Sequence, residues 1–230
     1  MCMGLTKIRK SEPLAKTALK VLRRSILTNE LTTNVVYNEK SLAKDLGISR
    51  TPVREALLEL SAKRLIKFLP QKGVVINTFS EKEIEDVFEI RTALEVFSIK
   101  KACINHKTLD ISGLNNFLQV QKDAAWQKNA VAFMEADRNF HITFTRLTKN
   151  TYLMEMMQDI RDIMHLMGFK ALTQKSRMQE VITEHDAILA AVIKGQVPEA
   201  MQLMETHLEY SKLAVKQSKQ EEKTNGETGN

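Results

Sequence analysis

Apolar residues recur at helical spacing near the start of the chain. An apolar residue appears at every fourth position of the first stripe, which consists of Leu14, Ala18, Leu22 and Ile26. This spacing predicts an amphipathic helix that ends near residue 29. Ser11 is a suitable N-cap for that helix, and Pro13 is tolerated in its first turn because the N–H groups there have no helical partner.

Two more helices and a hairpin follow. The second helix is predicted to begin after Asn38 and to stop at Gly47, because glycine readily adopts the left-handed conformation that ends helices. The third starts within residues 49–52, and its buried face comprises Val53, Ala56, Leu57 and Leu60. The short apolar runs 65–69 and 74–77 flank the polar segment 70–73 and predict a β-hairpin. This order of elements is that of a winged helix-turn-helix.

From Ser80 onward the pattern is helical throughout. Ser80 and Glu83 form a predicted capping box, in which each side chain satisfies the backbone N–H of the other residue. The apolar spacing predicts six helices, over about 80–106, 109–127, 130–148, 151–170, 177–194 and 197–217. We therefore expect a mainly α protein with a winged helix-turn-helix over 1–77, an all-helical domain over 78–217 and a disordered polar tail over 218–230.

The charge divides along the chain in the same way. The net charge of the 230 residues is +6. Residues 1–77 hold 15 Lys and Arg against 6 Asp and Glu, a balance of +9, and the remainder holds 19 against 22, a balance of −3. A basic first third indicates a partner that is a polyanion, such as nucleic acid, although chance asymmetry on solvated faces gives the same count.

Other classes of protein are disfavoured. The longest wholly apolar run, residues 187–193, is far shorter than the roughly 20 residues that a membrane-spanning helix needs. Residues 1–10 lack the apolar core of a secretory signal. Cys2 and Cys103 are too few for a disulfide framework, so we expect reduced thiols and a cytoplasmic location.

Basic and hydroxylated residues gather at the start of the third predicted helix. Arg50 and Arg54 lie four residues apart on the face opposite the apolar stripe. Each guanidinium can form paired hydrogen bonds with guanine O6 and N7 in the major groove, which contributes roughly 1–3 kcal/mol of discrimination. Ser49 and Thr51 suit phosphates. The alternative is that these arginines are merely solvated.

The hairpin supplies a further candidate contact with DNA. Lys72 and Gly73 lie at its predicted tip, where a wing could approach the backbone or the minor groove. For Lys72, too, simple solvation is the alternative.

Four residues of the helical half could hold a metal ion. Asp137 and His141 are four residues apart and therefore face the same point, and His185 and His207 lie in apolar helical stretches. One carboxylate and three imidazoles suit a divalent ion such as Zn, Ni or Mn, with positions left for water or a ligand. A buried histidine is, however, more often a hydrogen-bonded core residue.

The segment over residues 41–57, SLAKDLGISRTPVREAL, resembles the signature of the GntR family of bacterial transcription regulators. The resemblance spans about residues 14–77. It implies that Arg50 and Arg54 read bases, that Ser49 and Thr51 anchor the operator, and that Lys40 contacts phosphate. The sequence departs from the family pattern twice, because Thr33-Asn34 replaces a usual Pro-Gly and Lys63-Arg64 replaces a usual glycine. Both departures question the loop geometry rather than the family.

The helical half resembles the FCD ligand-binding domain of the FadR branch of that family. The resemblance lies in residues 137–141, DRNFH, in residues 184–188, EHDAI, and in His207-Leu208. It implies that Asp137 and the three histidines coordinate a metal. It also implies that Arg91 lies at the effector pocket, where a guanidinium can clamp a carboxylate. A salt bridge to Glu95 is an equally good interpretation of Arg91, and Arg161 is a weaker pocket candidate.

The sequence therefore predicts a homodimeric repressor or activator that binds double-stranded operator DNA and responds to an organic-acid effector. The family dimerises mainly through its helical domain, and two-fold dimers match palindromic sites. The alternative is a metal-dependent hydrolase built on the His and Asp residues. No nucleophile or general acid stands beside those residues in the sequence, which disfavours an enzyme. A purely architectural nucleic-acid binder is a third interpretation.

Overall fold

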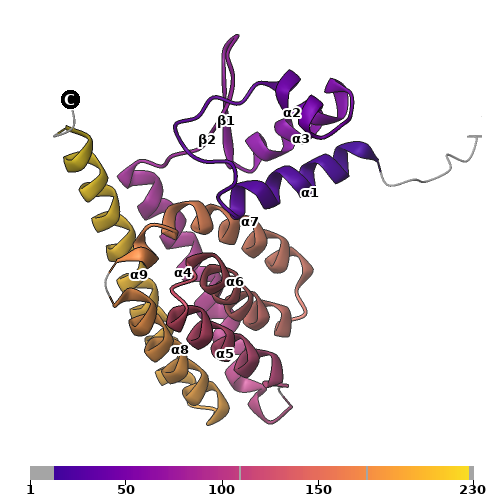
Figure 1. Ribbon diagram of the computed structural model, residues 1–230. Helices are drawn as coiled ribbons and strands as arrows, with labels where there is room; N and C mark the ends of the chain where they lie inside the picture. The colour runs from indigo at the N-terminus through magenta and orange to yellow at the C-terminus, as the bar shows by residue number, and fades with distance from the viewer. Residues whose placement is uncertain (1–12, 109, 175, 228–230) are drawn as a thin grey trace, which may run out of the picture. The chain divides into compact units, whose positions relative to one another are not determined.

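The computed structural model describes residues 13–108, 110–174 and 176–227 (Figure 1). The chain forms two compact units, which meet in sequence between Asn77 and Thr78. The mainly α fold with a small hairpin is confirmed. Ser11 and Cys2, for which the sequence predicts an N-cap and a reduced thiol, lie outside the described residues.

The first unit is a winged helix-turn-helix. Its elements are α1 (Leu14–Leu27), α2 (Glu39–Asp45), α3 (Arg50–Ala62), β1 (Ile66–Leu69) and β2 (Gly73–Ile76). Helix α1 packs against α3 through the predicted apolar stripes, and the two strands pair antiparallel with Ile66 opposite Ile76. Burial of these stripes fixes α3 with its polar face outward.

Left-handed residues mark the connections of this unit. Gly47 has φ +66°, as predicted for the residue that ends α2. Both departures from the family pattern contain a residue of the same kind, since Asn34 has φ +66° and Arg64 has φ +58°. The Asn77 side chain donates to the Arg64 carbonyl oxygen at 2.9 Å and holds that turn. The loops thus keep the backbone geometry that glycine favours without having glycine.

A third extended segment joins the hairpin. The Tyr37 N–H donates to the Val74 carbonyl oxygen at 2.8 Å, and the Val74 N–H donates to the Tyr37 carbonyl oxygen at 2.9 Å. Gly73 permits this close approach, because its φ is +133° and a Cβ atom there would overlap the Tyr37 carbonyl oxygen. The hairpin is therefore attached to the segment that precedes α2.

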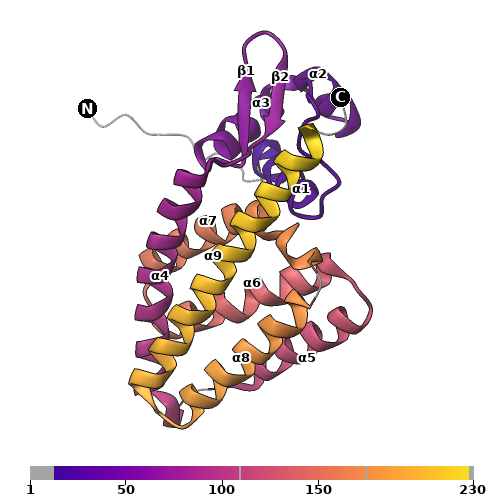
Figure 2. The ribbon, with the colours of Figure 1, turned by 90° about the vertical axis from the view of Figure 1, so that its left-hand side faces the viewer.

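The second unit is a helical bundle. Its α-helices are α4 (Glu81–Ile104), α5 (Ser112–Trp126), α6 (Ala130–Leu147), α7 (Thr151–Gly168), α8 (Arg177–Ile193) and α9 (Val197–Glu227), with the short 3-10 helices η1 (His106–Thr108) and η2 (Ala171–Thr173). The capping box of Ser80 and Glu83 is present at the start of α4. Helix α6 packs against α4, α5 and α7, and α9 packs against α4 and α8 (Figure 2).

Helix α9 is longer than the sequence predicts. The expected disordered tail over 218–230 is wrong for residues 218–227, which continue the helix, while 228–230 lie outside the described residues. Ser218 is buried, and the Lys219 ammonium donates to the Phe79 carbonyl oxygen. Lys212 and Lys216 both pair with Glu85 of α4. These contacts with α4 and its leading segment stabilise a polar sequence as helix, which its composition alone does not indicate.

The core of the bundle surrounds α6 and reaches α8 and α9. Phe140, Phe144, Ile188, Met204 and Leu208 form its centre, and all are almost fully buried. Since α6 is covered on several sides, even its polar side chains Asp137 and His141 are buried. In the described ranges, no helix is both long and apolar enough to cross a membrane.

Candidate functional site

The start of α3 presents the predicted DNA-reading side chains to solvent. Arg50 is the first residue of the helix with a side chain 67% exposed, and Arg54 is exposed one turn later. Thr51 is exposed, and Ser49 is the N-cap but makes no side-chain capping hydrogen bond. Glu39 lies 3.5 Å from the Arg50 guanidinium. Arg50 is therefore ion-paired with Glu39, while the exposure of all four side chains leaves them accessible to a ligand.

The other predicted contacts divide into two kinds. Lys40, in the first turn of α2, and Lys72, at the hairpin turn, are exposed. Gly73 is half-buried and lies against the backbone of Tyr37. Its glycine identity is thus explained by packing inside the unit.

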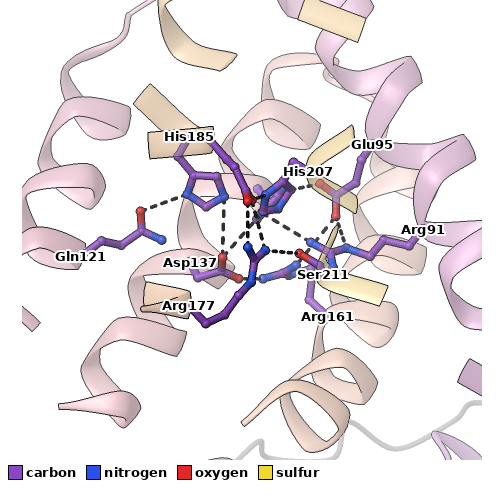
Figure 3. A network of polar contacts seen from close by, with 11 residues as sticks. Arg91, Glu95, Gln121, Asp137, Arg161, Arg177, His185, His207 and Ser211 are labelled. Carbon is purple, nitrogen blue, oxygen red and sulfur yellow. Dashed lines mark hydrogen bonds and ion pairs between the residues drawn. The ribbon is translucent and has the colours of Figure 1, made fainter. Parts of the chain in front are cut away.

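The bundle brings the four predicted metal ligands together. Asp137 and His141 come from α6, His185 from α8 and His207 from α9. Figure 3 shows Asp137, His185 and His207 gathered at one place. One ring nitrogen from each histidine lies within 4.8 Å of the others. The Asp137 Oδ1 atom is 3.7 Å from Nε2 of both His141 and His185. We call these four residues the histidine cluster.

Each histidine of the cluster is oriented through its Nδ1 atom. His141 donates to Glu95, His185 donates to the Gln121 side-chain oxygen at 3.0 Å, and His207 donates to Glu184 at 2.6 Å. Among the described residues, the buried Nε2 atoms of His185 and His207 have no hydrogen-bond partner. Hydrogen bonding of one ring nitrogen to a carboxylate or amide, with the other left facing a common point, is the arrangement that metal-binding histidines adopt.

Asp137, His185 and His207 also have the protonation states that a metal requires. Burial lowers the pKa of His185 and of His207 well below the usual value, and the neighbouring imidazoles lower it further. Burial alone would raise the pKa of Asp137, but Arg161 and His141 outweigh it and lower that pKa well below its usual value. Neutral His185 and His207 and an ionised Asp137 are ready to bind a cation without first losing protons.

The distances test the fit directly. Ligands that bind one zinc ion at roughly 2.0–2.2 Å lie at most about 4.4 Å apart. The two Asp137 distances of 3.7 Å satisfy this limit, and the histidine nitrogens, all within 4.8 Å of one another, lie close to it. The donor set fits a divalent ion.

A small cavity adjoins the cluster. Asp137, Arg91 and Arg161 line it, together with Arg177 and Ser211, and its volume is about 50 Å³. Arg91 donates to Glu95 at 2.7 Å, as the salt-bridge interpretation predicts, and it also lines the cavity; its role at an effector pocket stays a prediction. We call this space the inner cavity.

Arg91 and Arg161 differ in how completely their guanidinium groups are hydrogen-bonded. Arg161 donates to Asp137 Oδ2, which leaves Oδ1 facing the histidines. The buried Nε atom of Arg161 has no partner among the described residues. An unsatisfied buried donor beside a cavity is suited to an acceptor group of a ligand.

Three residues that surround the cluster, Gln121, Glu184 and Arg177, were not predicted from the sequence as part of the site. Gln121 and Glu184 orient histidines, and Arg177 holds Glu184 with two hydrogen bonds of 2.7 and 3.1 Å and Ser211 with one of 3.2 Å. Gln121 carried a usable signal, because it is a polar residue on the otherwise apolar buried face of α5, which contains Leu114, Leu118 and Ala124. Nothing in the sequence marks Glu184 or Arg177 as part of the site, since charged residues are common on helices.

Comparison with known proteins agrees with this architecture. Residues 14–76 match the gntR family of bacterial regulatory proteins, and residues 86–210 match the FCD domain. The chain is 27% identical over 180 residues to the gluconate operon transcriptional repressor of Bacillus licheniformis, covering 76% of this chain and 72% of that protein. It is 24% identical over 216 residues to the HTH-type transcriptional repressor RspR of Escherichia coli K12, covering 94% and 95%.

A solved structure has the same fold. A transcriptional regulator GntR from Rhodococcus sp. RHA1 superposes with a TM-score of 0.80 at 20% identity, covering 87% of this chain and 96% of that one. The alternative of a metal-dependent hydrolase is not supported, because the matched family and the relatives are regulators. The chain belongs to the GntR family of bacterial transcriptional regulators, with an FCD domain as its second unit.

Proposed function

We propose that this regulator is a repressor whose affinity for its operator is set by a small organic acid bound beside a metal ion in the FCD domain. The observation that carries the proposal is the histidine cluster, in which three buried imidazoles held through Nδ1 turn their other nitrogen towards a common point. Two of the relatives are named repressors, which supports the direction of regulation.

In this proposal the first unit reads DNA through α3. Arg50 and Arg54 contact base edges in the major groove, and Ser49, Thr51 and Lys40 contact phosphates, with Lys72 of the hairpin at the backbone. Their exposure supports these roles. Since its target is operator DNA, we place the protein in the compartment that holds a bacterial chromosome, the cytoplasm.

The cluster would hold one Zn, Ni or Mn ion through Asp137 and the three histidines. Such an ion would supply a Lewis-acidic centre with coordination positions open to an anionic ligand. Elemental analysis with native mass spectrometry of the purified protein tests this directly. We expect one divalent ion per chain and a marked loss in His185→Ala, whereas equal metal content in the two proteins would contradict the site.

The charges around the inner cavity favour an anion once the metal is bound. Arg91 and Arg161 balance Glu95 and Asp137, so these four side chains sum to zero formal charge. A divalent ion then leaves an excess of positive charge, which attracts a carboxylate. An effector of this kind regulates only if it binds one conformation of the protein better than another.

We also propose a homodimer, because palindromic operators require two reading heads. Helix α4 has exposed apolar side chains at Ile90, Phe97 and Ile104, at intervals of seven residues, besides its buried face. A stripe of this spacing on one face suits packing against an identical helix. Phe97→Glu should convert the dimer to folded monomers in native mass spectrometry. A dimer that persists in this variant would exclude the α4 stripe as the interface.

A further inference from the structure

Arg161 of α7 lies among the charged groups that surround the histidine cluster. Its side chain is 3% exposed, and its two terminal nitrogens face carboxylates. The Nη2 atom donates to Asp137 Oδ2, and the Nη1 atom lies 3.8 Å from Glu95 Oε1 (Figure 3). The guanidinium therefore connects α7 with a candidate metal ligand on α6 and with a carboxylate on α4.

These contacts leave little of the guanidinium for an effector. An arginine clamps a carboxylate with two parallel N–H groups. Both terminal nitrogens of Arg161 already face Asp137 or Glu95. Its buried Nε atom, which has no partner in the part of the chain that the structure describes, can add one hydrogen bond but not a clamp. The contacts of Arg161 point first to Asp137.

The two oxygens of Asp137 have different surroundings. Oδ2 accepts from Arg161, whereas Oδ1 lies 3.7 Å from Nε2 of both His141 and His185. A carboxylate binds a metal ion through one oxygen or through both. Binding through both would require Oδ2 to give up a charge-assisted hydrogen bond in a buried site, where such bonds are strong. The contacts therefore favour coordination through Oδ1 alone.

Glu95 holds Arg161 in place from the other side. The Arg91 Nε atom donates to Glu95 Oε1 at 2.7 Å, and His141 Nδ1 donates to Glu95 Oε2. Since two further side chains fix Glu95, its attraction for Arg161 has a fixed direction. The guanidinium is thus held between Asp137 and Glu95, and it does not simply follow the Asp137 carboxylate when that side chain moves.

The number of carboxylate oxygens at the cluster influences which ion it prefers. Three imidazoles and one carboxylate oxygen make four donors, which is the number that zinc usually takes from a protein and its ligands. Manganese prefers oxygen donors and a higher coordination number, whereas imidazole suits zinc and nickel. A second oxygen from Asp137 would shift the preference of the site towards manganese.

We propose that Arg161 selects the metal ion, because it restricts Asp137 to one coordinating oxygen and so favours zinc over manganese. This inference rests on the proposed function, which places a divalent ion at the histidine cluster. Arg161 acts through Asp137 and is a positioning residue.

The relative affinity for two ions tests this role. Competition of the full-length protein with a chromogenic chelator gives the affinities for Zn²⁺ and Mn²⁺ separately. Arg161→Met removes the donor and its charge, and the loss of charge strengthens the attraction of both divalent ions alike. The ratio of the two affinities therefore isolates the effect of coordination. We expect the preference for zinc to fall at least about fivefold in Arg161→Met. A merely structural role would change both affinities in parallel, and an unchanged ratio would overturn the proposal.

Arg138→Met is the matched control. Arg138 of α6 donates to Asp162 of α7, a carboxylate outside the histidine cluster. The control variant thus loses the same charge between the same two helices, and it should keep the wild-type ratio. An equal fall of the ratio in both variants would assign the effect to general electrostatics and refute the role of Arg161.

A crystal structure of the zinc-loaded wild-type protein gives a test that does not depend on the folding of a variant. We expect the ion within about 2.2 Å of Asp137 Oδ1, with Oδ2 still hydrogen-bonded to Arg161. Zinc coordinated by both oxygens of Asp137 would overturn the proposal.

The outcomes separate this inference from the proposed function. If neither Zn²⁺ nor Mn²⁺ binds to the wild-type protein, the metal of the proposed function is wrong and the role of Arg161 is wrong with it. If an ion binds and the ratio is the same in wild type and Arg161→Met, the metal site stands and only the selection by Arg161 is wrong.

Discussion

His207 donates its Nδ1 hydrogen to Glu184 at 2.6 Å, and Glu184 at the same time accepts two hydrogen bonds from Arg177. This relationship fixes the orientation of the imidazole on α9 through a carboxylate on α8. The Nε2 atom of His207 is thereby directed into the cluster. Partners of this kind around metal ligands strengthen binding by orienting the ring and raising its basicity.

The first prediction concerns this partner. Glu184→Gln should lower the affinity for the bound metal by about 10–100-fold, because the amide orients the His207 ring less firmly and loses the charge that faces Arg177. Competition against a chromogenic chelator measures the change. Glu180→Gln is the control, since this neighbouring carboxylate contacts Arg177 but no histidine. Unchanged metal affinity in Glu184→Gln would show that Glu184 has no part in the site.

The second prediction concerns DNA recognition by α3. Arg50→Ala and Arg54→Ala should each cost about 1–3 kcal/mol of specific binding and relax sequence preference, because each removes a guanidinium that we propose contacts a base edge. Lys72→Ala should instead weaken binding to all sequences by a similar factor. It should also make the slope of log K against log salt concentration shallower by about 1. Gel shifts with a selected operator against random duplex, over a range of salt, measure both effects. Unaltered sequence selectivity in both arginine variants would contradict the assignment.

The third prediction uses two glycines of the first unit. Gly73→Ala should destabilise that unit by more than about 2 kcal/mol, because the new Cβ overlaps the Tyr37 carbonyl oxygen and φ is +133°. Gly47→Ala should cost only about 1–2 kcal/mol, since it suffers the left-handed backbone alone and no atom lies within 4 Å of its Cβ position. Urea unfolding followed by circular dichroism compares them. Equal losses would mean that contact with Tyr37 contributes nothing.

The fourth prediction concerns the end of α9. Removal of residues 218–230 should destabilise the helical unit by about 1–3 kcal/mol, because the buried Ser218 and the Lys219 contact with the Phe79 carbonyl oxygen are lost. Removal of residues 228–230 alone serves as the control and should change the free energy of unfolding very little. Thermal or urea unfolding measures both. Equal stability of the two truncated chains would restore the prediction of a disordered tail over 218–230.

The periodicity of apolar residues was sufficient to predict most helices and the hairpin. The spacing of apolar residues predicted each long helix and the hairpin, because burial of one face decides where these elements form. The end of α9 was not predictable, since its polar residues are helical only through their contacts with the preceding segment and α4. Likewise, the pairing of Tyr37 with Val74 depends on tertiary contact.

The candidate site was predictable in part for a similar reason. The interval between Asp137 and His141 places both on one helical face whatever surrounds them, so local geometry predicts that they act together. Gln121 and Glu184 orient histidines of other helices, and that relation exists only after the bundle has packed. Arg91 shows the limit clearly, because the spacing in the sequence predicts its pairing with Glu95, whereas a position beside a cavity was expected only from the family resemblance.

The continuous helix α9 connects the histidine cluster with the segment that precedes α4. His207 lies in the cluster, and Lys219, about 18 Å further along the axis, holds the carbonyl of Phe79. Phe79 is two residues beyond Asn77, where the first unit ends. A tilt or slide of α9 on ligand binding would therefore displace the Phe79 carbonyl, which lies at the start of the second unit.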